Sequence, residues 1–157
     1  MSRMYQALLF AHSWIRWVVL LLGLTAFVFA ASGRFRKRPW TSRDEAVGRW
    51  FVISVDVQVL LGLVLYLLFS SFTVPALRNL ADAMADTIIR FWAVEHLVGM
   101  LAATAFAHVG RRRIRKAPDA ARKHFTAAVF FGLALVLMVI SIPWPFGATG
   151  RPMFRAG

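Results

Sequence analysis

The sequence contains no cysteine, so disulfides, iron–sulfur clusters and thiolate metal sites are excluded in any compartment. It also lacks the motifs of soluble enzymes, because no phosphate-binding glycine loop, HExxH motif or nucleophile elbow occurs in it. Acidic residues are scarce: the sequence has seven Asp and Glu but nineteen Lys and Arg. Asp119 has no carboxylate partner nearby in the sequence. These absences argue against hydrolytic chemistry.

Hydrophobic residues make up 59% of the 157 residues and occur in four blocks separated by short polar stretches. Each block reaches the ~20 apolar residues that a helix needs to cross ~30 Å of hydrocarbon. The first block is also too long for a typical signal-peptide core, so we expect it to stay as a helix. The pattern predicts an all-α fold: a single integral membrane domain over 1–157, an up-down four-helix bundle with helices at about 5–31, 50–70, 88–110 and 125–145.

The positive charge is concentrated between the blocks. Thirteen of the nineteen basic residues fall in two short loops, at 34–49 and 111–123. The positive-inside rule makes these the cytoplasmic loops of a multi-pass protein with both termini on the outer side. They can also hold anionic lipid headgroups, at ~1 kcal/mol per basic residue. The charge is therefore a topology signal, and nucleic acid is not an expected partner.

The stretch from Thr73 to Thr87 links the second and third blocks on the expected outer side. Pro75 occupies a plausible first helical position, and apolar residues follow at three- and four-residue spacing, at Leu77, Leu80, Met84 and Ile88. This spacing predicts one short amphipathic helix lying on the outer surface. Asp82 and Asp86 would face water from it.

Ionisable residues inside a membrane span cost ~2.5–3.5 kcal/mol each at mid-bilayer, so each needs a reason. His12 in the first helix and His96 in the third lie at nearly the same depth, His12 roughly 10 Å below the outer surface by its rise along the helix. Two histidines at one level could bind a single ion or a haem iron between them. Small side chains follow each histidine on its own face, and they could leave room for a flat macrocycle. The alternative is that the small residues only allow close helix packing and the histidines hydrogen-bond locally.

His108 and His124 form a second possible pair near the inner interface. Both lie beside basic residues, where an imidazole is cheap to keep in water. A solvated interfacial role is the favoured interpretation of this pair.

Arg16 projects from almost the same face as His12, one turn deeper, and needs a counter-charge. Asp56 in the second helix comes close to it in depth, which predicts a buried Arg16–Asp56 pair between two helices. The alternative is that Arg16 neutralises a haem propionate or polarises a quinone carbonyl. Glu95, beside His96, could orient an imidazole of a neighbouring helix or relay protons.

The segments HSWIRW, VQVLLGLVLYLL, VEHL and IPWPF together resemble small cytochrome-b-like bacterial membrane proteins of the cytochrome b561 and CopD type. The resemblance implies haem b held by histidine pairs between helices, in the bacterial inner membrane, with electrons passing to or from quinone or a partner protein. It makes His12 and His96 axial ligands, and His108 and His124 candidates for a second haem. Many relatives place a histidine in the second helix, where this chain has Asp56 and Gln58.

Two functions follow as expectations. The first is a small haem b subunit that passes electrons, with Arg16 near the propionates; iron with two imidazole ligands has no open position and suits electron transfer. The second is a cofactor-free accessory subunit of a larger respiratory or photosynthetic membrane complex, whose polar residues, including Asp56, Gln58 and Glu95, join helices or subunits. Either is favoured over a stand-alone enzyme.

Overall fold

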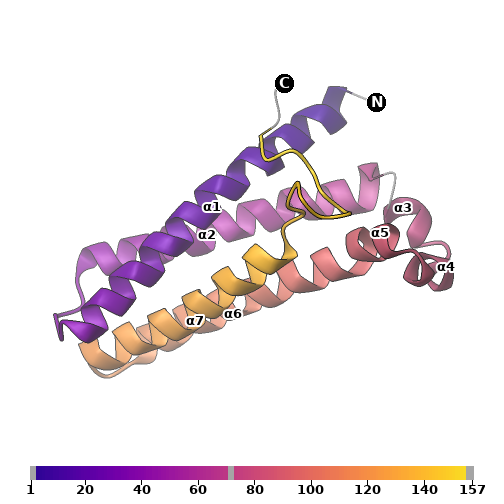
Figure 1. Cartoon of the computed structure of the whole chain (residues 1–157). Helices are drawn as coiled ribbons and strands as arrows, with labels where there is room; N and C mark the ends of the chain where they lie inside the picture. Colours follow the sequence, from indigo (N-terminus) through magenta and orange to yellow (C-terminus); the bar gives the residue numbers. More distant parts are fainter. Residues whose placement is uncertain (1–2, 71–72, 155–157) are drawn as a thin grey trace.

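The computed structural model describes residues 3–70 and 73–154. Four helical segments in it are long and apolar enough to cross a membrane, as predicted, and they pack as an all-helical bundle (Figure 1). The second and third segments each contain a π-helical turn. The segments are α1 (Arg3–Phe35), α2 (Ser42–Val64) continued by η1 (Leu65–Phe69), α5 (Thr87–Arg90) with η2 (Phe91–Glu95) continued by α6 (His96–Lys116), and α7 (Ala120–Ser141).

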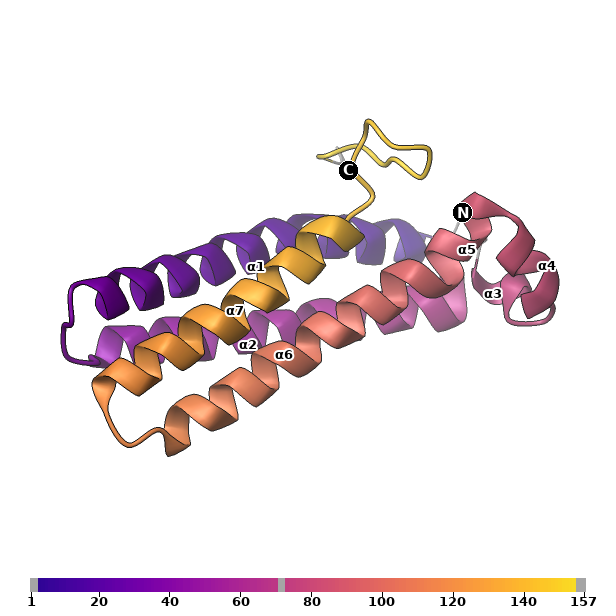
Figure 2. The same ribbon diagram turned by 60° about the horizontal axis from the view of Figure 1, so that its bottom comes forward.

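The bundle has two distinct ends. The α1–α2 and α6–α7 loops lie together at one end (Figure 2). This end is called the basic end below, because these loops and the helix ends beside them carry most of the basic residues. Both chain ends and the short helices between η1 and α5 lie toward the other end, called the terminal end (Figure 1). This is the up-down order that the hydrophobic blocks predict.

At the basic end α2 and α7 begin before the apolar blocks, because polar caps stabilise the first turns of these two helices. The Thr41 side chain caps α2 in a capping box with Asp44, and the Asp119 side chain accepts from Arg122 N at 2.7 Å to cap α7. Asp44 is buried and receives both guanidinium nitrogens of Arg38, at 2.5 and 2.7 Å. Hydrogen bonding to this carboxylate raises the pKa of Arg38. A count of apolar residues alone misses these turns.

The predicted single surface helix over residues 73–87 is wrong. Three short helices take its place: α3 (Thr73–Ala76), α4 (Leu80–Ala85) and α5. The break before α5 falls at Asp86, whose extended backbone and side chain, accepting from Ile88 N and Ile89 N at 2.8 Å, begin a new helix. Asp82 and Asp86 are exposed as expected.

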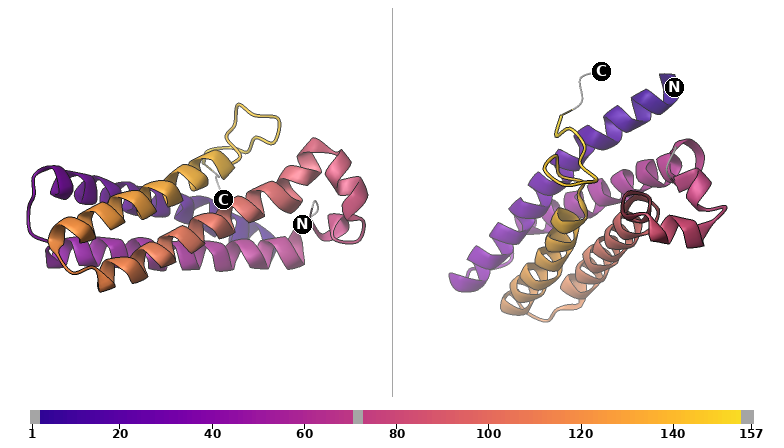
Figure 3. Two further views of the ribbon diagram at one scale, coloured as in Figure 1. Left: turned by 90° about the horizontal axis from the view of Figure 1, so that it is seen from below. Right: turned by 45° about the vertical axis from the view of Figure 1, so that its right-hand side comes forward.

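The last helix ends at Ser141 because proline follows closely. Ile142 is extended (φ −75°, ψ 134°), the conformation favoured before Pro143. The chain then folds back as a tail, residues 142–154, beside the terminal half of α1 (Figures 1 and 3). The Met153 carbonyl accepts from Arg16 Nη2 at 2.7 Å and from Trp17 Nε1 at 3.2 Å, which attaches the tail to α1.

Small residues serve close packing in the half of the bundle toward the basic end. Gly23 of α1 faces Phe51 so closely that a Cβ there would lie 2.7 Å from the ring. Ala103 and Ala107 of α6 are completely buried. Phe51 and Phe131 fill the centre of the bundle, where their rings meet edge to face with ring centres 5.3 Å apart. The prediction that the small residues below the histidines leave room for a macrocycle is therefore wrong. The alternative, that these small residues allow close helix packing, is confirmed for Gly23, Ala103 and Ala107.

Candidate functional site

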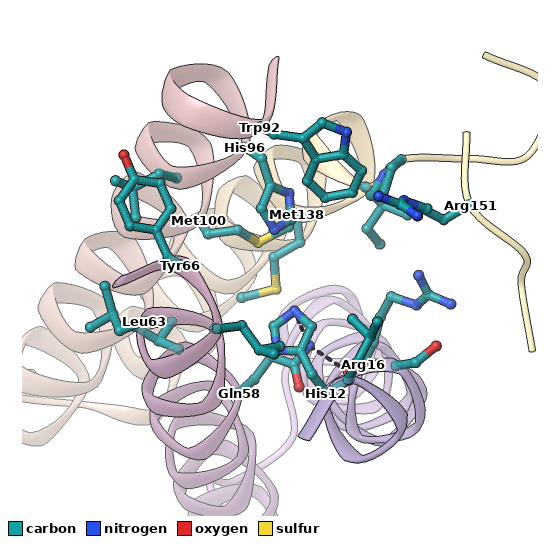
Figure 4. A pocket seen from close by; sticks show the side chains of 18 of the residues that line it. His12, Arg16, Gln58, Leu63, Tyr66, Trp92, His96, Met100, Met138 and Arg151 are labelled. Atoms are coloured by element: carbon teal, nitrogen blue, oxygen red, sulfur yellow. Dashed lines mark hydrogen bonds between the residues drawn. The ribbon is translucent and has the colours of Figure 1, made fainter. Parts of the chain in front are cut away.

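A cavity of about 180 Å³ lies between the helices in the half of the bundle toward the terminal end (Figure 4). Its wall is mostly apolar, and no Asp or Glu occurs among the described residues that form it. Nitrogen-bearing side chains enter the wall from α1, α2, η2, α6 and the tail: His12, Arg16, Gln58, Trp92, His96 and Arg151. The two histidines that the sequence places at one depth thus belong to one cavity.

His96 is oriented by the last residue of α7. Its Nδ1 lies 2.7 Å from the Ser141 carbonyl oxygen, which can only accept, so Nδ1 carries the proton. In a neutral imidazole Nε2 is then left with its lone pair. Gly99 makes this approach possible, because a Cβ there would collide with Ser141 Oγ. This is the outer hydrogen bond that metal-binding histidines almost always make.

Two π-helical turns flank the cavity at the terminal end. η2 ends directly before His96, and η1 contains Tyr66, whose hydroxyl donates to the Ala93 carbonyl in η2 at 2.7 Å. Thr73 Oγ1 in turn donates to the Tyr66 carbonyl at 2.5 Å. A π turn holds one residue more than an α turn and so redirects the side chains around it; such turns are frequent at functional sites. Hydrophobic spacing gives no signal for them.

His12 is held less tightly than His96. Its ring lies against Gly62 of α2, where a Cβ would be 3.1 Å from Cε1. The Gln58 amide donates to the His12 carbonyl at 2.9 Å and lies 3.4 Å from ring Nε2. His12 Nδ1 is buried and makes no hydrogen bond within the described residues. One nitrogen of this imidazole is thus unsatisfied.

Two methionines occupy the space between the histidines. Met100 of α6 and Met138 of α7 project between His12 and His96 (Figure 4). Met100 follows His96 by four residues, on the same helix face, so sequence spacing could have found it. The Met138 contact depends on how α7 packs, which spacing does not give. The cavity that remains is smaller than the ~300–1,000 Å³ pockets of drug-sized ligands.

The predicted Arg16–Asp56 pair is wrong. Arg16 bonds instead to the Met153 carbonyl of the tail, and its Nε is buried with no hydrogen-bond partner within the described residues. Asp56 accepts from His108 Nε2 at 2.7 Å, a contact between α2 and α6 in which both side chains are about half exposed. Equal depth in the membrane did not predict the partner of either residue, because the two side chains face different neighbours.

Glu95 does not bond to an imidazole. Its carboxylate accepts from Arg90 Nε at 2.8 Å, and half of the side chain is exposed. It also lies outside the cavity wall. The expectation that Glu95 orients a histidine of a neighbouring helix is therefore wrong.

The structure gives His108 and His124 different surroundings. His108 bonds to Asp56. His124 is fully buried and lies against Gly33 and Trp40, with the centres of the His124 and Trp40 rings 4.9 Å apart. Neither His124 ring nitrogen has a hydrogen-bond partner within the described residues. The predicted solvated role is wrong for His124, and neither histidine lines the cavity described above.

The donor set of the cavity limits the metals it suits. The part of the chain that the structure describes contains no cluster of three His, Asp or Glu side chains placed to hold a metal ion. Structural zinc commonly takes four protein ligands, whereas haem brings its own ring nitrogens and needs only axial ligands. Of the two metal alternatives raised by the sequence, two imidazoles in one cavity suit haem better than a bare ion.

Comparison with known proteins gives no relative. No protein-family model matches the chain, and neither a curated protein nor a solved structure matches it. The resemblance to cytochrome b561 and CopD-type proteins stays a prediction.

Proposed function

We propose that the chain is a small membrane electron-transfer subunit that binds haem b in the cavity, with His12 and His96 as axial ligands. The observation that carries the proposal is the presence of two imidazoles from different helices in one apolar cavity, one of them with its outer nitrogen already bonded to a carbonyl. Haem supplies reversible one-electron chemistry when bound, and iron with two imidazole ligands has no open position for oxygen.

The His96 contact leaves this histidine prepared for a ligand role. An axial ligand needs its inner nitrogen unprotonated. Donation from Nδ1 to Ser141 O keeps the lone pair on Nε2 and limits rotation of the ring. The bond also adds electron density to the imidazole.

The His12 site supports the second ligand. A buried nitrogen without a partner costs roughly 1–3 kcal/mol, and a bond to iron would remove that cost. The ring rests on Gly62 and has only a long contact to Gln58, so it can turn toward the centre of the cavity. Met100 and Met138 are unbranched and flexible, and their repacking would give a macrocycle room between the histidines.

Arg16 fits the edge of such a site. Its guanidinium lies beside the cavity with Nε unsatisfied, and arginine pairs well with carboxylates. We assign it to a haem propionate. The orientation inferred from the basic loops would place the cofactor in the outer half of a bacterial inner membrane, near outer electron carriers, membrane quinone or another membrane subunit. The basic loops would then meet anionic headgroups on the cytoplasmic side.

One observation favours the second function, a cofactor-free accessory subunit of a respiratory or photosynthetic complex. The half-exposed Asp56–His108 pair lies within membrane-length helices, where polar groups facing lipid are costly. A polar group of a neighbouring subunit would reduce that cost. Fixed-stoichiometry copurification with a larger complex in mild detergent, without colour, would support this function over the first.

The absorption spectrum of the purified full chain tests the haem proposal. We expect a Soret band and a reduced-minus-oxidised change, with about one haem per chain. His12→Ala and His96→Ala should each abolish the spectrum, because each removes an axial ligand. His108→Ala is the matched control, a histidine of α6 outside the cavity, and should keep it. A colourless chain, or colour lost only through His108, would contradict the proposal.

A further inference from the structure

We propose that the chain forms a two-fold symmetric dimer through α2 and α6, in which the Asp56–His108 pair of one copy meets that of the other. This inference goes beyond the proposed function and does not depend on haem. α2 and α6 run side by side along one side of the bundle (Figure 2), and the pair joins them there at 2.7 Å. A second copy of the chain is the partner that this face fits.

The pair is polar in a place that lipid would otherwise cover. The exposed fraction is 42% for the Asp56 side chain and 50% for the His108 side chain. Asp56 follows Arg49, the last basic residue of α2, by seven residues, which is roughly 10 Å along the helix. On this face, contact with protein would replace a costly contact with lipid. Other outward surfaces carry exposed apolar side chains that suit lipid, such as Leu21, Leu24 and Val28 in α1 and Leu133, Val136 and Ile140 in α7.

The pair also has hydrogen-bonding capacity that it does not use within one chain. The bond joins His108 Nε2 to Asp56 Oδ1, whereas His108 Nδ1 and Asp56 Oδ2 have no hydrogen-bond partner among the described residues. A carboxylate oxygen accepts, and in a protonated imidazole both nitrogens donate. A second pair of the same kind therefore supplies a partner for each unused atom. Two carboxylates and two protonated imidazoles are also neutral together, which lowers the cost of placing them in a membrane.

A two-fold axis brings the complementary atoms of two copies together. All copies should cross the membrane in the same direction, because the same basic loops stay in the cytoplasm, so the axis of a symmetric dimer runs along the membrane normal. Half a turn about such an axis beside the α2–α6 face places α2 of one copy opposite α6 of the other. Asp56 and His108 are bonded and so lie at one depth. Each Asp56 then meets the partner's His108, and the four side chains form a ring that alternates carboxylate and imidazole.

The surface around the pair suits contact between two copies. Leu60 in α2 and Ala105 in α6 lie about one turn from the pair toward the terminal end, and both are exposed. Leu101, one turn further along α6, is exposed and also belongs to the cavity wall. A second copy on this face would pack these side chains around the polar ring and would shield the ring from lipid. It would also cover the cavity at Leu101.

Cysteine cross-linking in native membranes tests the interface, because the chain has no cysteine of its own. Leu60 and Ala105 are about level, four and three residues from Asp56 and His108. A chain with Leu60→Cys and a chain with Ala105→Cys, expressed together, should therefore form a disulfide-linked dimer on mild oxidation. Val136→Cys, at an exposed position of α7, is the control and should not cross-link. Absence of the Leu60–Ala105 cross-link, or a cross-link through Val136→Cys alone, would overturn the inference.

Exchanging the two groups tests the polar ring itself. A chain with Asp56→His has imidazoles at both positions, and a chain with His108→Asp has carboxylates at both. Each variant alone should associate about ten-fold more weakly than the wild type, which is 1.4 kcal/mol, because symmetry removes two contacts at once. The two variants mixed should associate again, since the carboxylates of one copy meet the imidazoles of the other. Energy transfer between copies labelled at Val136→Cys in lipid bilayers measures the association.

The outcomes decide the inference without a haem spectrum, so failure of the proposed function leaves this test intact. Recovery in the mixture cannot come from the fold of one chain, because the pair within each chain is absent in both variants. A mixture that associates no better than the single variants, or a wild type that stays monomeric in bilayers, would overturn the inference. A cross-link from Leu60→Cys to a different membrane subunit in place of a second copy would overturn it and favour the accessory function. The cross-link uses the intact pair, so it decides the question even where the exchanged variants fold poorly.

Discussion

The His96 side chain donates a hydrogen bond of 2.7 Å from Nδ1 to the carbonyl oxygen of Ser141, the last residue of α7. The bond joins α6 to α7 at the point where the tail begins. It exists because a glycine, Gly99, lies where any side chain would meet Ser141. Helix packing and the direction of the His96 lone pair are thus set by the same contact.

Gly99→Ala should therefore disturb both packing and ligation. The new methyl group would collide with Ser141 Oγ and push α7 away, and overpacking of this kind costs about 1–3 kcal/mol. We expect a lower melting temperature and weaker haem retention, measured by thermal unfolding and Soret absorbance. Gly147→Ala is the control, since a Cβ there meets only an ordinary contact at 3.7 Å. An unchanged Gly99→Ala protein would show that the helices are not constrained at this point.

Gly62→Ala should act on the other histidine. Its Cβ would lie 3.1 Å from His12 Cε1 and would force the ring to move by a few tenths of an ångström or more. We expect weaker axial ligation, seen as a partial high-spin spectrum. Gly48→Ala crowds Phe131 at the same 3.1 Å, far from the cavity, and should lower stability without changing the spin state. Equal spectra for the two variants would show that His12 is not a ligand of the haem iron.

The Asp56–His108 pair should be coupled energetically but should not affect the cofactor. A double-mutant cycle with Asp56→Asn and His108→Ala should give a coupling energy of about 0.5–3 kcal/mol, the range for residues in contact. The absorption spectrum should stay that of the wild type in all three variants. A spectral change in His108→Ala alone would show that this histidine, contrary to our account, contributes to the haem site.

Topology can be measured directly because the chain has no cysteine of its own. Ala81→Cys lies in α4 toward the terminal end, and Ala121→Cys lies in the first turn of α7 at the basic end; both positions are exposed. In intact cells a membrane-impermeant thiol reagent should label only Ala81→Cys, because the basic loops should stay in the cytoplasm. Labelling of Ala121→Cys alone would reverse the orientation and place the cavity on the cytoplasmic side.

The sequence allowed the four membrane-length helices to be predicted because apolar length is a local property. It also allowed His12 and His96 to be placed at one level, since the rise along a helix depends only on residue number. The partner of Arg16 could not be predicted, because depth does not give the direction in which a side chain projects. Two helices at equal depth still leave the rotation of each helix free.

The tail and the π turns lay beyond sequence reasoning for a different reason. Arg151 reaches the cavity only because Phe154 and the Met153 carbonyl contact Trp17 and Arg16, which are tertiary contacts of an irregular segment. The π turns leave hydrophobic composition unchanged while altering side-chain direction. Small residues gave a misleading signal, since Gly23 and Ala103 are packed against other helices and leave no room for a cofactor.

The identity of the two axial ligands is the most direct test of the account. Magnetic circular dichroism of the oxidised protein in the near infrared distinguishes bis-imidazole iron from imidazole–thioether iron. We predict a bis-imidazole signal for the wild type and for His108→Met, and an imidazole–thioether signal for His12→Met and for His96→Met. A wild type with another ligand pair, or a bis-imidazole signal that survives in His12→Met or His96→Met, would contradict the central claim that these two histidines hold one haem.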